Sequence, residues 1–250
     1  MKIQHLIAYI GLNLIAYIGL ICFINATAPL QAAEPLRHMT LQQLCQPLPL
    51  QPTYEQFQAY EHCTKEQGPE QIARYFAQIY QKKQGKAILA YLDGSELRLQ
   101  DVIVDDAEHY QNFFLWGCDH SKRYCVIFKA GWEWWSYLLI DRKTKLSTEL
   151  TGAPVFSPDS QLVFEYLDSR NSDTFDRNIV KLYRLKDDKI TLLLERNDSD
   201  FGVHSAKWLG PSTLEASLQH FAPEDYSRYV EVGRMRLVVS GDEVNLFIEK

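Results

Sequence analysis

Two groups of acidic residues carry oxygen atoms that could bind a hard cation or act as acid and base in hydrolysis. The first group is Asp105, Asp106 and Glu108 beside His109, and the second is Asp168, Asn171, Asp173 and Asp176. Such ligands suit Ca²⁺, but neither spacing follows the EF-hand loop. Glycoside hydrolysis needs two carboxylates at a defined separation across a cleft, which spacing along the chain does not reveal. We expect solvated turn residues and predict no metal or cofactor.

Other common catalytic signatures are absent from the sequence. The histidines that follow residue 34 form neither HExxH nor a close pair, and they are His38, His62, His109, His120, His204 and His220. The chain also contains no G-x-S-x-G elbow, P-loop or dinucleotide-binding glycine pattern. The sequence therefore predicts a protein that is not an enzyme, with a carboxylate-dependent envelope hydrolase as the remaining catalytic alternative.

The segment Gly131 to Tyr137 has the most unusual composition of the chain, since it contains Trp132, Trp134, Trp135 and Tyr137. On a strand, Trp132 and Trp134 would project from one face and Trp135 and Tyr137 from the other. One face must be core. The other is covered by a neighbouring sheet or presented to a ligand, because aromatic rings with a polar edge suit protein hot spots and sugar stacking.

The N-terminal segment predicts export. Residues 1–24 form an apolar run after the single cation Lys2, and the first acidic residue is Glu34. We interpret residues 1–33 as a signal peptide with a mature start near Glu34, or as an uncleaved anchor, because the apolar run approaches the roughly 20 residues that span a bilayer. The expected location is the periplasm or the exterior, with membrane contact only through this segment.

The charge balance excludes one class of partner. Removing residues 1–33 leaves 25 basic residues against 32 acidic ones, a net charge of −7. A protein that binds nucleic acid through its phosphates needs a basic surface. We therefore predict no nucleic-acid partner.

Four cysteines remain after export: Cys45, Cys63, Cys118 and Cys125. In an oxidising compartment they allow three pairings. Proximity favours Cys45 with Cys63 and Cys118 with Cys125. Zinc is not expected, because no CxxC pair is present.

Residues 34–85 have a helical pattern. Thr40 with Gln43 and Thr53 with Gln56 are capping-box candidates, and Gly68-Pro69 predicts a break followed by a third helix. That helix would carry an apolar stripe at helical spacing, formed by Ile72, Tyr75, Phe76, Ile79 and Tyr80. We predict a small N-terminal helical subdomain over 34–85.

From residue 86 to residue 250 the apolar period changes to two, which is typical of strands. Asp93-Gly94 predicts a type I′ hairpin turn, and further turns are expected at 142–145, 186–189 and 240–242. The pattern predicts about a dozen short antiparallel strands and a mainly β fold.

One repeat in this region resembles a known family. Asp141-x-x-Thr144, followed by Leu150 to Phe164 (LTGAPVFSPDSQLVF), resembles the repeat of TolB-like β-propellers. Ser160 stands where that family has glycine, and Lys145 where a glycine often closes the preceding turn. Degenerate echoes lie at 119–128 and 208–216. Equivalent starts at Arg123, Gln161 and Thr213 are separated by 38 and 52 residues, which bracket a four-stranded blade. The resemblance implies propeller-like repeats, as three to four blades or an open blade array, and implies scaffold rather than chemistry.

Together these features favour an exported protein-interaction module whose partner is another envelope protein. A specific version is an inhibitor or immunity protein of an envelope-acting enzyme, with the polar insertion at 168–178 as the plug. The alternative is a glycan or cell-wall binding protein that uses Trp132, Trp134 or Trp135.

Overall fold

The computed structural model describes residues 40–45, 54–104, 109–132, 134–167, 178–198, 201–222 and 225–249. The chain divides into two units, Met1–Arg37 and His38–Lys250. The first unit, with the predicted export segment 1–33, lies outside the described residues. None of the described helices is long and apolar enough to cross a membrane.

The N-terminal helices form one short element and one long one. Helix α2 spans Leu41–Leu44, and a continuous helical run contains α3 (Tyr54–His62), a π-helical turn (Cys63–Gln67) and α4 (Gly68–Tyr75). The predicted break at Gly68-Pro69 is wrong. Pro69 lacks an N–H group, and the chain stays helical because the Gly68 N–H donates to Cys63 O across the π turn.

The predicted disulfide between Cys45 and Cys63 is confirmed and joins α2 to the long helical run. The two elements approach closely at Gly68. A Cβ atom at this position would lie 2.3 Å from Leu41 Cδ1 and 2.7 Å from Cys63 O. The glycine therefore permits the contact that the disulfide secures.

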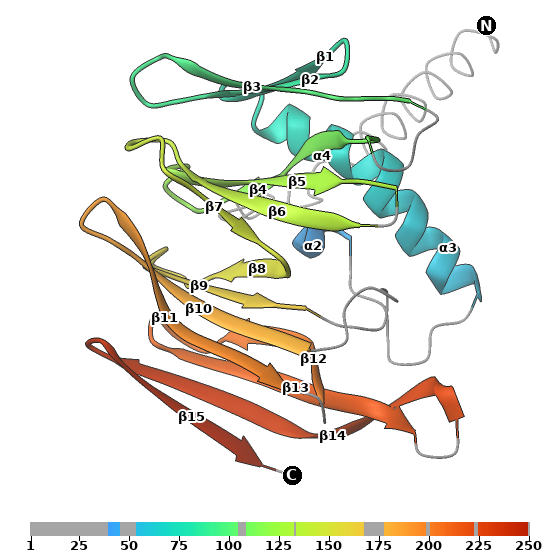
Figure 1. Ribbon diagram of the computed structural model, residues 1–250, viewed down its shortest axis with the longest axis vertical. Coiled ribbons are helices and arrows are strands. Elements are labelled where there is room, and N and C mark those ends of the chain that lie inside the picture. The colour runs from blue at the N-terminus through green and yellow to red at the C-terminus, as the bar shows by residue number, and fades with distance from the viewer. Residues whose placement is uncertain are drawn as a thin grey trace, which may run out of the picture. The chain divides into compact units, whose positions relative to one another are not determined.

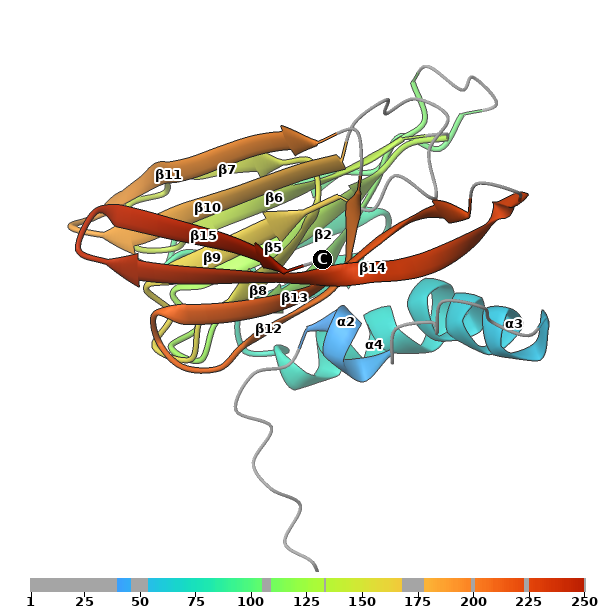
Figure 2. The ribbon, with the colours of Figure 1, turned by 90° about the horizontal axis from the view of Figure 1, so that it is seen from below.

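The described helices within the subdomain predicted over 34–85 pack against the β-rich part of the chain. Ile72 and Phe76 are buried in the same core as Leu115 and Ile127 of the adjacent sheet. The chain before α2 also forms a bridge from Thr40 to Gly117 in that sheet. Figure 2 shows the helices along one side of the strands. Moreover, strand β1 already begins at Tyr80.

The β-rich part is mainly antiparallel, as predicted, and consists of four sheets in chain order (Figure 1). Sheet 1 contains β1 (Tyr80–Lys83), β2 (Lys86–Ala90) and β3 (Glu96–Gln100), and sheet 2 contains β4 (Asn112–Cys118), β5 (Tyr124–Ala130), β6 (Trp135–Asp141) and β7 (Ser147–Leu150). Sheet 3 contains β8 (Ala153–Phe156), β9 (Leu162–Tyr166), β10 (Asn178–Lys186) and β11 (Lys189–Asp198). Sheet 4 contains β12 (Gly202–Trp208), β13 (Thr213–Ala222), β14 (Asp225–Ser240) and β15 (Glu243–Glu249).

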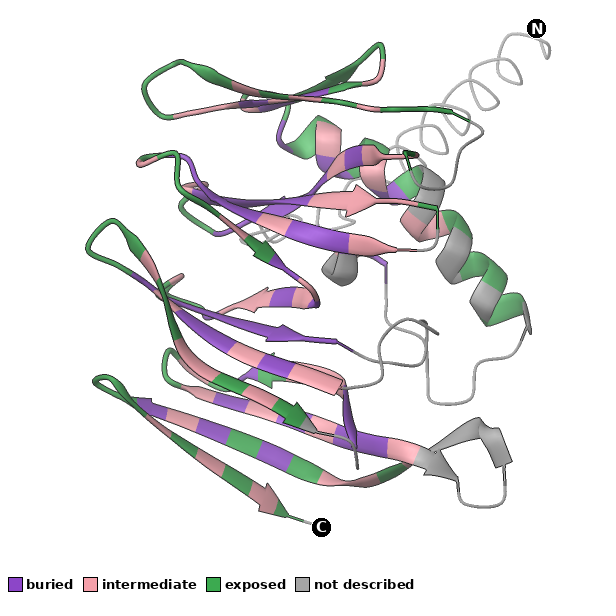
Figure 3. Cartoon of the chain, in the orientation of Figure 1, coloured by how far each residue is buried: buried purple, intermediate pink, exposed green. Residues whose placement is uncertain are grey.

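Each sheet is a simple meander, in which consecutive strands are neighbours. Sheets 2, 3 and 4 have four strands, whereas sheet 1 has three. The buried residues form two hydrophobic cores. Figure 3 marks the buried positions along the strands. Strand β9 serves both, because successive side chains alternate: Val163 belongs to the first core and Phe164 to the second.

The outward faces of the two end sheets are polar. In sheet 1 the pairing places Lys83, Lys86 and Gln100 in one row. In sheet 4 it places Lys207, Glu215 and Arg236 in one row, which ends at Phe247. Polar faces of this kind suit solvent, so neither end sheet needs a further sheet to cover an apolar surface.

The turns show where sequence signals were accurate and where they were not. Lys145 (φ 65°) and Ser160 (φ 59°) are left-handed, a conformation that glycine adopts more readily than other residues. At the predicted type I′ turn only Gly94 (φ 84°) is left-handed. Asp93 instead accepts hydrogen bonds from the backbone N–H and hydroxyl of Ser95, which stabilises a different turn.

Candidate functional site

The aromatic segment lies at the tip of the hairpin formed by β5 and β6. Strand β6 begins only at Trp135, so Trp132 and Trp134 belong to the turn and do not alternate on a strand as expected. The turn is closed by a hydrogen bond from Gly131 N to Trp134 O, 2.7 Å. Trp132 is 62% exposed.

Three of the four predicted aromatic residues are partly or wholly used in packing. Lys129 Nζ lies 4.9 Å from the centroid of the Trp134 ring. Trp135 is half-buried against the first core. Tyr137 is only 6% exposed and makes edge contacts with Trp116 and Phe128. Of this set, Trp132 therefore offers the largest free surface.

Residues from outside the segment Gly131 to Tyr137 lie near Trp132. Its ring meets Tyr110 edge to face, with centroids 6.3 Å apart and planes at 86°. Gln111, the next residue, forms a bridge with Val102. Val102, Ile103 and Val104 are all exposed, Ile103 at 66%. We name Val102, Ile103, Val104, Tyr110 and Trp132 the aromatic tip.

A sequence signal for the aromatic tip did exist. Val102, Ile103 and Val104 form a β-branched run inside the region where the apolar pattern predicts short strands. The run is exposed because β3 ends at Gln100 and the chain turns toward β4 two residues later. Exposed apolar residues that cluster in this way are typical of interaction sites.

The predicted acidic sites cannot be placed. Asp168, Asn171, Asp173 and Asp176, with the proposed plug at 168–178, lie almost wholly outside the described residues, as do Asp105, Asp106 and Glu108. Across the described ranges, no three His, Cys, Asp or Glu side chains gather in a way that could hold a metal ion.

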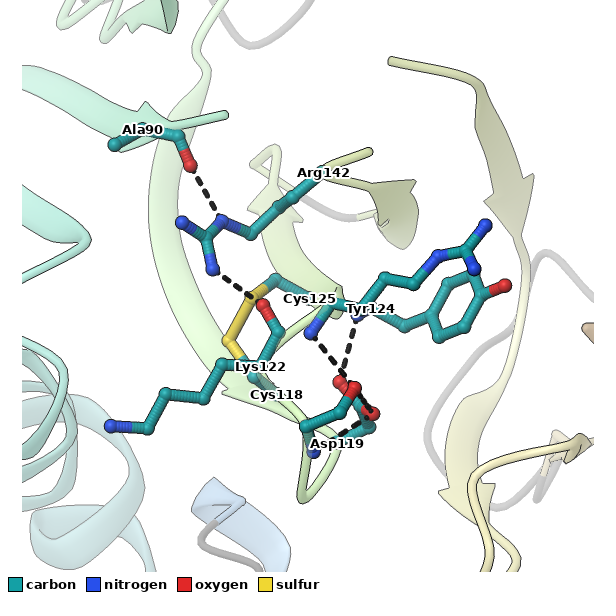
Figure 4. The surroundings of a disulfide bond; sticks show 9 residues. Ala90, Cys118, Asp119, Lys122, Tyr124, Cys125 and Arg142 are labelled. Carbon is teal, nitrogen blue, oxygen red and sulfur yellow. Dashed lines mark hydrogen bonds between the residues drawn. A yellow bond between two sulfur atoms is a disulfide. The ribbon is translucent and has the colours of Figure 1, made fainter. Parts of the chain in front are cut away.

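The second predicted disulfide, Cys118 with Cys125, is also confirmed (Figure 4). It closes the turn between β4 and β5, where the buried Asp119 carboxylate accepts hydrogen bonds from Ser121 N and Tyr124 N. Arg142 reaches this turn and donates to Lys122 O and to Ala90 O of sheet 1. Burial lowers the pKa of Arg142, and the charge of Asp119 opposes that shift. These groups hold sheets 1 and 2 together.

Ion pairs between turns connect neighbouring sheets. Arg123 bonds to Asp141 (2.6 Å) in sheet 2 and to Asp188 (2.7 Å) in the turn after β10 of sheet 3. Lys143 also reaches Asp188, at 2.9 Å. Lys145 pairs with Asp93 of sheet 1 at 2.8 Å. The charged turns therefore have a structural role, because they connect neighbouring sheets.

This network predicts a loss of stability in acid. Hydrogen bonds from Lys143 and Arg123 lower the pKa of Asp188, and although burial alone would raise the pKa of Asp141, its bonds to Arg123, Lys143 N and Thr144 lower it. A carboxyl whose pKa is lowered by folding stabilises the fold above its unfolded value of about 3.9, and that contribution disappears as pH falls through the folded value.

We therefore expect the free energy of unfolding to fall as the pH decreases below about 4. Denaturant titrations at a series of pH values would measure the slope. Asp188→Asn should reduce that slope, whereas Asp187→Asn, in the same exposed turn, should leave it nearly unchanged. Equal slopes in the wild type and the Asp188 variant would contradict the assignment.

Comparisons with known proteins establish no family. No family model matches the chain, and no curated protein matches it. Among solved structures, it is similar to hydrazine synthase of Kuenenia stuttgartiensis, with 8% identity and a TM-score of 0.33 over 66% of this chain and 59% of that one. It is also similar to the tricorn protease, with 10% identity and a TM-score of 0.33 over 61% of this chain and 16% of that one. The chain thus spans less than two thirds of either protein.

Proposed function

We propose that this chain is an exported protein-interaction module that binds another envelope protein through its aromatic tip. The observation that carries the proposal is the position of Trp132, 62% exposed at the end of a hairpin and in contact with Tyr110. An exposed tryptophan costs solvation free energy, which burial against a partner recovers. Tryptophan and tyrosine are also enriched among residues that dominate binding energy at protein interfaces.

The arrangement of the rings favours a protein over a glycan. A sugar stacks on an open ring face, and a row of such faces makes an extended platform. Here Tyr110 and Trp132 are nearly perpendicular, and Lys129 covers part of Trp134. The neighbouring Ile103 and Val104 add aliphatic surface, which suits the apolar centre of a protein interface.

The scaffold that we propose is an open array of four propeller-like blades. Four consecutive meanders and the repeat pattern around Asp141 and Ser157 support it. The polar outward faces of sheets 1 and 4 favour an open array over a closed ring, because ring closure would bury them against each other. In the inhibitor version of this proposal, the projecting tip enters the active site of an envelope enzyme.

Trp132→Ala is expected to weaken partner binding by about 2 kcal/mol, roughly 30-fold, since truncating a hot-spot tryptophan has an effect of this size. The full-length chain, expressed in its native host with a C-terminal tag, would be purified with its partner. Affinity for the identified partner would then be measured for each variant.

Phe247→Ala is the matched control, because Phe247 is a comparably exposed aromatic residue (53%) on sheet 4. It should bind like the wild type. If Trp132→Ala also binds like the wild type, the aromatic tip is not the interface. If binding is competed by cell-wall glycan, the glycan alternative replaces the proposal.

A further inference from the structure

Sheet 1 has an open edge where the other sheets have a fourth strand. Sheets 2, 3 and 4 end with β7, β11 and β15, but sheet 1 ends with β3. Strand β3 pairs with β2 over its full length, from Glu96 to Gln100. Its other side has no neighbouring strand within the described residues. An edge of this kind offers backbone groups to another chain.

The hydrogen-bond pattern shows which backbone N–H and C=O groups of β3 point away from β2. Tyr91 N donates to Ser95 O, and Asp101 N donates to Gly85 O, so odd-numbered residues of β3 direct their backbone groups toward β2. In an antiparallel pair the alternate residues point away. The N–H and C=O groups of Glu96, Arg98 and Gln100 therefore face outward. At the next even residue, Val102, the same side is occupied by Gln111, which both donates to and accepts from it at 2.9 Å.

The open edge leads directly to the aromatic tip, because Val102 belongs to it. A segment that added alongside β3 would pair with residues 96–100 and would reach the bridge between Val102 and Gln111, where the free edge ends. Beyond this point the segment would leave the sheet beside Tyr110, which is next to Gln111 and contacts Trp132. The edge and the tip form one continuous surface for a partner.

The charge of sheet 1 is opposite to that of the whole chain. Its three strands contain Lys82, Lys83, Lys86 and Arg98 against the single acid Glu96, while the chain carries −6. Arg98 pairs with Glu96 and Lys82 pairs with Asp101, each at 2.6 Å, so Lys83 and Lys86 carry the excess positive charge. Lys83 and Lys86 are directly opposite each other on the outward face. Neither has an ion-pair partner among the residues that the structure describes. Like charges placed in this way repel, so an anionic partner relieves the repulsion.

The two faces of β3 determine how apolar and polar residues should alternate along an added strand. Leu97 and Leu99 are half-buried and pack on the first core, so residues beside them would be apolar. Arg98 and Gln100 lie on the outward face, next to Lys86. A glutamate opposite Gln100 would be two strand spacings, about 10 Å, from Lys86, within the combined reach of the two side chains.

We propose that the outer edge of β3 is a strand-addition site that takes an extended, alternating apolar and acidic segment of the partner protein as the fourth strand of sheet 1. Main-chain hydrogen bonds to Glu96, Arg98 and Gln100 would supply affinity, and the basic outward face would select the acidic sequence. This inference rests on the proposed binding function, but it is tested at other residues.

The probe is an acetylated and amidated heptapeptide in which glutamate and valine alternate, and the matched probe has lysine in place of glutamate. Amide hydrogen exchange would be followed by NMR on the exported, purified chain. We expect the glutamate peptide to slow exchange of the Glu96, Arg98 and Gln100 amides at least about tenfold. The amides of Leu97 and Leu99, already bonded to β2, should change little, and the lysine peptide should have no effect.

Two variants separate strand addition from charge attraction. Arg98→Pro removes an outward N–H and the guanidinium, whereas Arg98→Ala removes the guanidinium alone. Proline is tolerated on an edge strand where its nitrogen faces solvent. Arg98→Ala should keep the protection of Glu96 and Gln100, and Arg98→Pro should abolish it.

Four results would overturn the proposal: no protection in the wild type at millimolar peptide, equal protection by both peptides, equal loss in both variants, or protection of these amides in the chain alone. In the last case, protection that increases with protein concentration would identify a second copy of the chain as the occupant. Protection that does not depend on protein concentration would identify a segment of the same chain. If Arg98→Pro does not fold, the wild-type exchange data decide. Partner binding that depends on Trp132 but not on β3 would leave the proposed function standing without this site.

Discussion

Replacing Gly152 by alanine is expected to destabilise the protein by about 3 kcal/mol, because overpacking against backbone cannot be relieved by a rotamer change. Gly152 is buried in the link between β7 and β8, where the chain passes from sheet 2 to sheet 3. A Cβ atom there would lie 2.1 Å from Tyr166 O and 2.3 Å from Tyr166 C. The link would have to move away from β9, and the first core would open with it.

Urea titration followed by tryptophan fluorescence would measure this change, and thermal unfolding should show a decrease of roughly 6 to 12 °C. Gly210→Ala is the control, because no atom lies within 4 Å of its added Cβ and its backbone is not left-handed. It should change stability by less than about 0.5 kcal/mol. A Gly152 variant as stable as the Gly210 variant would show that the link does not approach β9 this closely.

Replacing Glu165 by alanine is expected to have the other large effect, a loss of about 4 kcal/mol. This residue is completely buried in β9. One carboxylate oxygen accepts hydrogen bonds from Thr151 N (2.7 Å) and Gly152 N (2.9 Å), and the other accepts from the Tyr183 hydroxyl (2.9 Å). Truncation would leave two N–H groups and a hydroxyl without partners away from water, and it would create a cavity.

The Tyr183 hydroxyl remains a donor in this arrangement. Burial, and then the charge and hydrogen bond of Glu165, raise the pKa of Tyr183 above its ordinary value. Tyr183→Phe removes one of the three bonds and keeps the ring in the core, so a loss of about 1 to 2 kcal/mol is expected. Glu165→Gln keeps an acceptor for the N–H groups of Thr151 and Gly152. Its loss of stability should lie between those of Glu165→Ala and Tyr183→Phe.

Denaturant titrations of the three variants would rank them. The order expected is Glu165→Ala as the least stable, then Glu165→Gln, then Tyr183→Phe. If Glu165→Ala and Tyr183→Phe lose equal stability, the bonds to Thr151 and Gly152 contribute nothing, and the carboxylate does not hold sheet 3 to the link. Gly152 and Glu165 both hold the link between β7 and β8 against β9. The double variant should therefore lose less stability than the sum of the losses in the two single variants.

Much of the fold could be predicted because its signals are local. The change of apolar period after Gly85, the turn at Arg142 to Lys145, and the proximity of Cys118 to Cys125 each depend on a few neighbouring residues. The structure confirms a mainly β chain and both disulfides. The small helical subdomain over 34–85 stays a prediction. The apolar stripe of its third helix was visible in the sequence, and the structure decides that Ile72 and Phe76 share a core with Leu115 and Ile127 of sheet 2.

The candidate site could be predicted only in part. The aromatic composition of Gly131 to Tyr137 was visible, but the exposure of Trp132 and the burial of Tyr137 depend on where β6 begins and on what covers it. The contribution of Tyr110 and Ile103 arises because two chain segments meet at the bridge between Val102 and Gln111. Such contacts are nonlocal, so no periodicity in the sequence reports them.

The sequence by itself determined the secondary structure class, the positions of most turns and the acidic balance, because these follow from local conformational preference and from counting. Proximity along the chain favoured the two disulfide pairs that form. Only the tertiary structure decided which tryptophan is exposed and that, among the residues it describes, sheet 1 has three strands and β3 lies at its edge. Every strand carries the same backbone groups, and pairing alone determines which of them remain free. The two surfaces proposed for binding are therefore properties of how the strands are assembled.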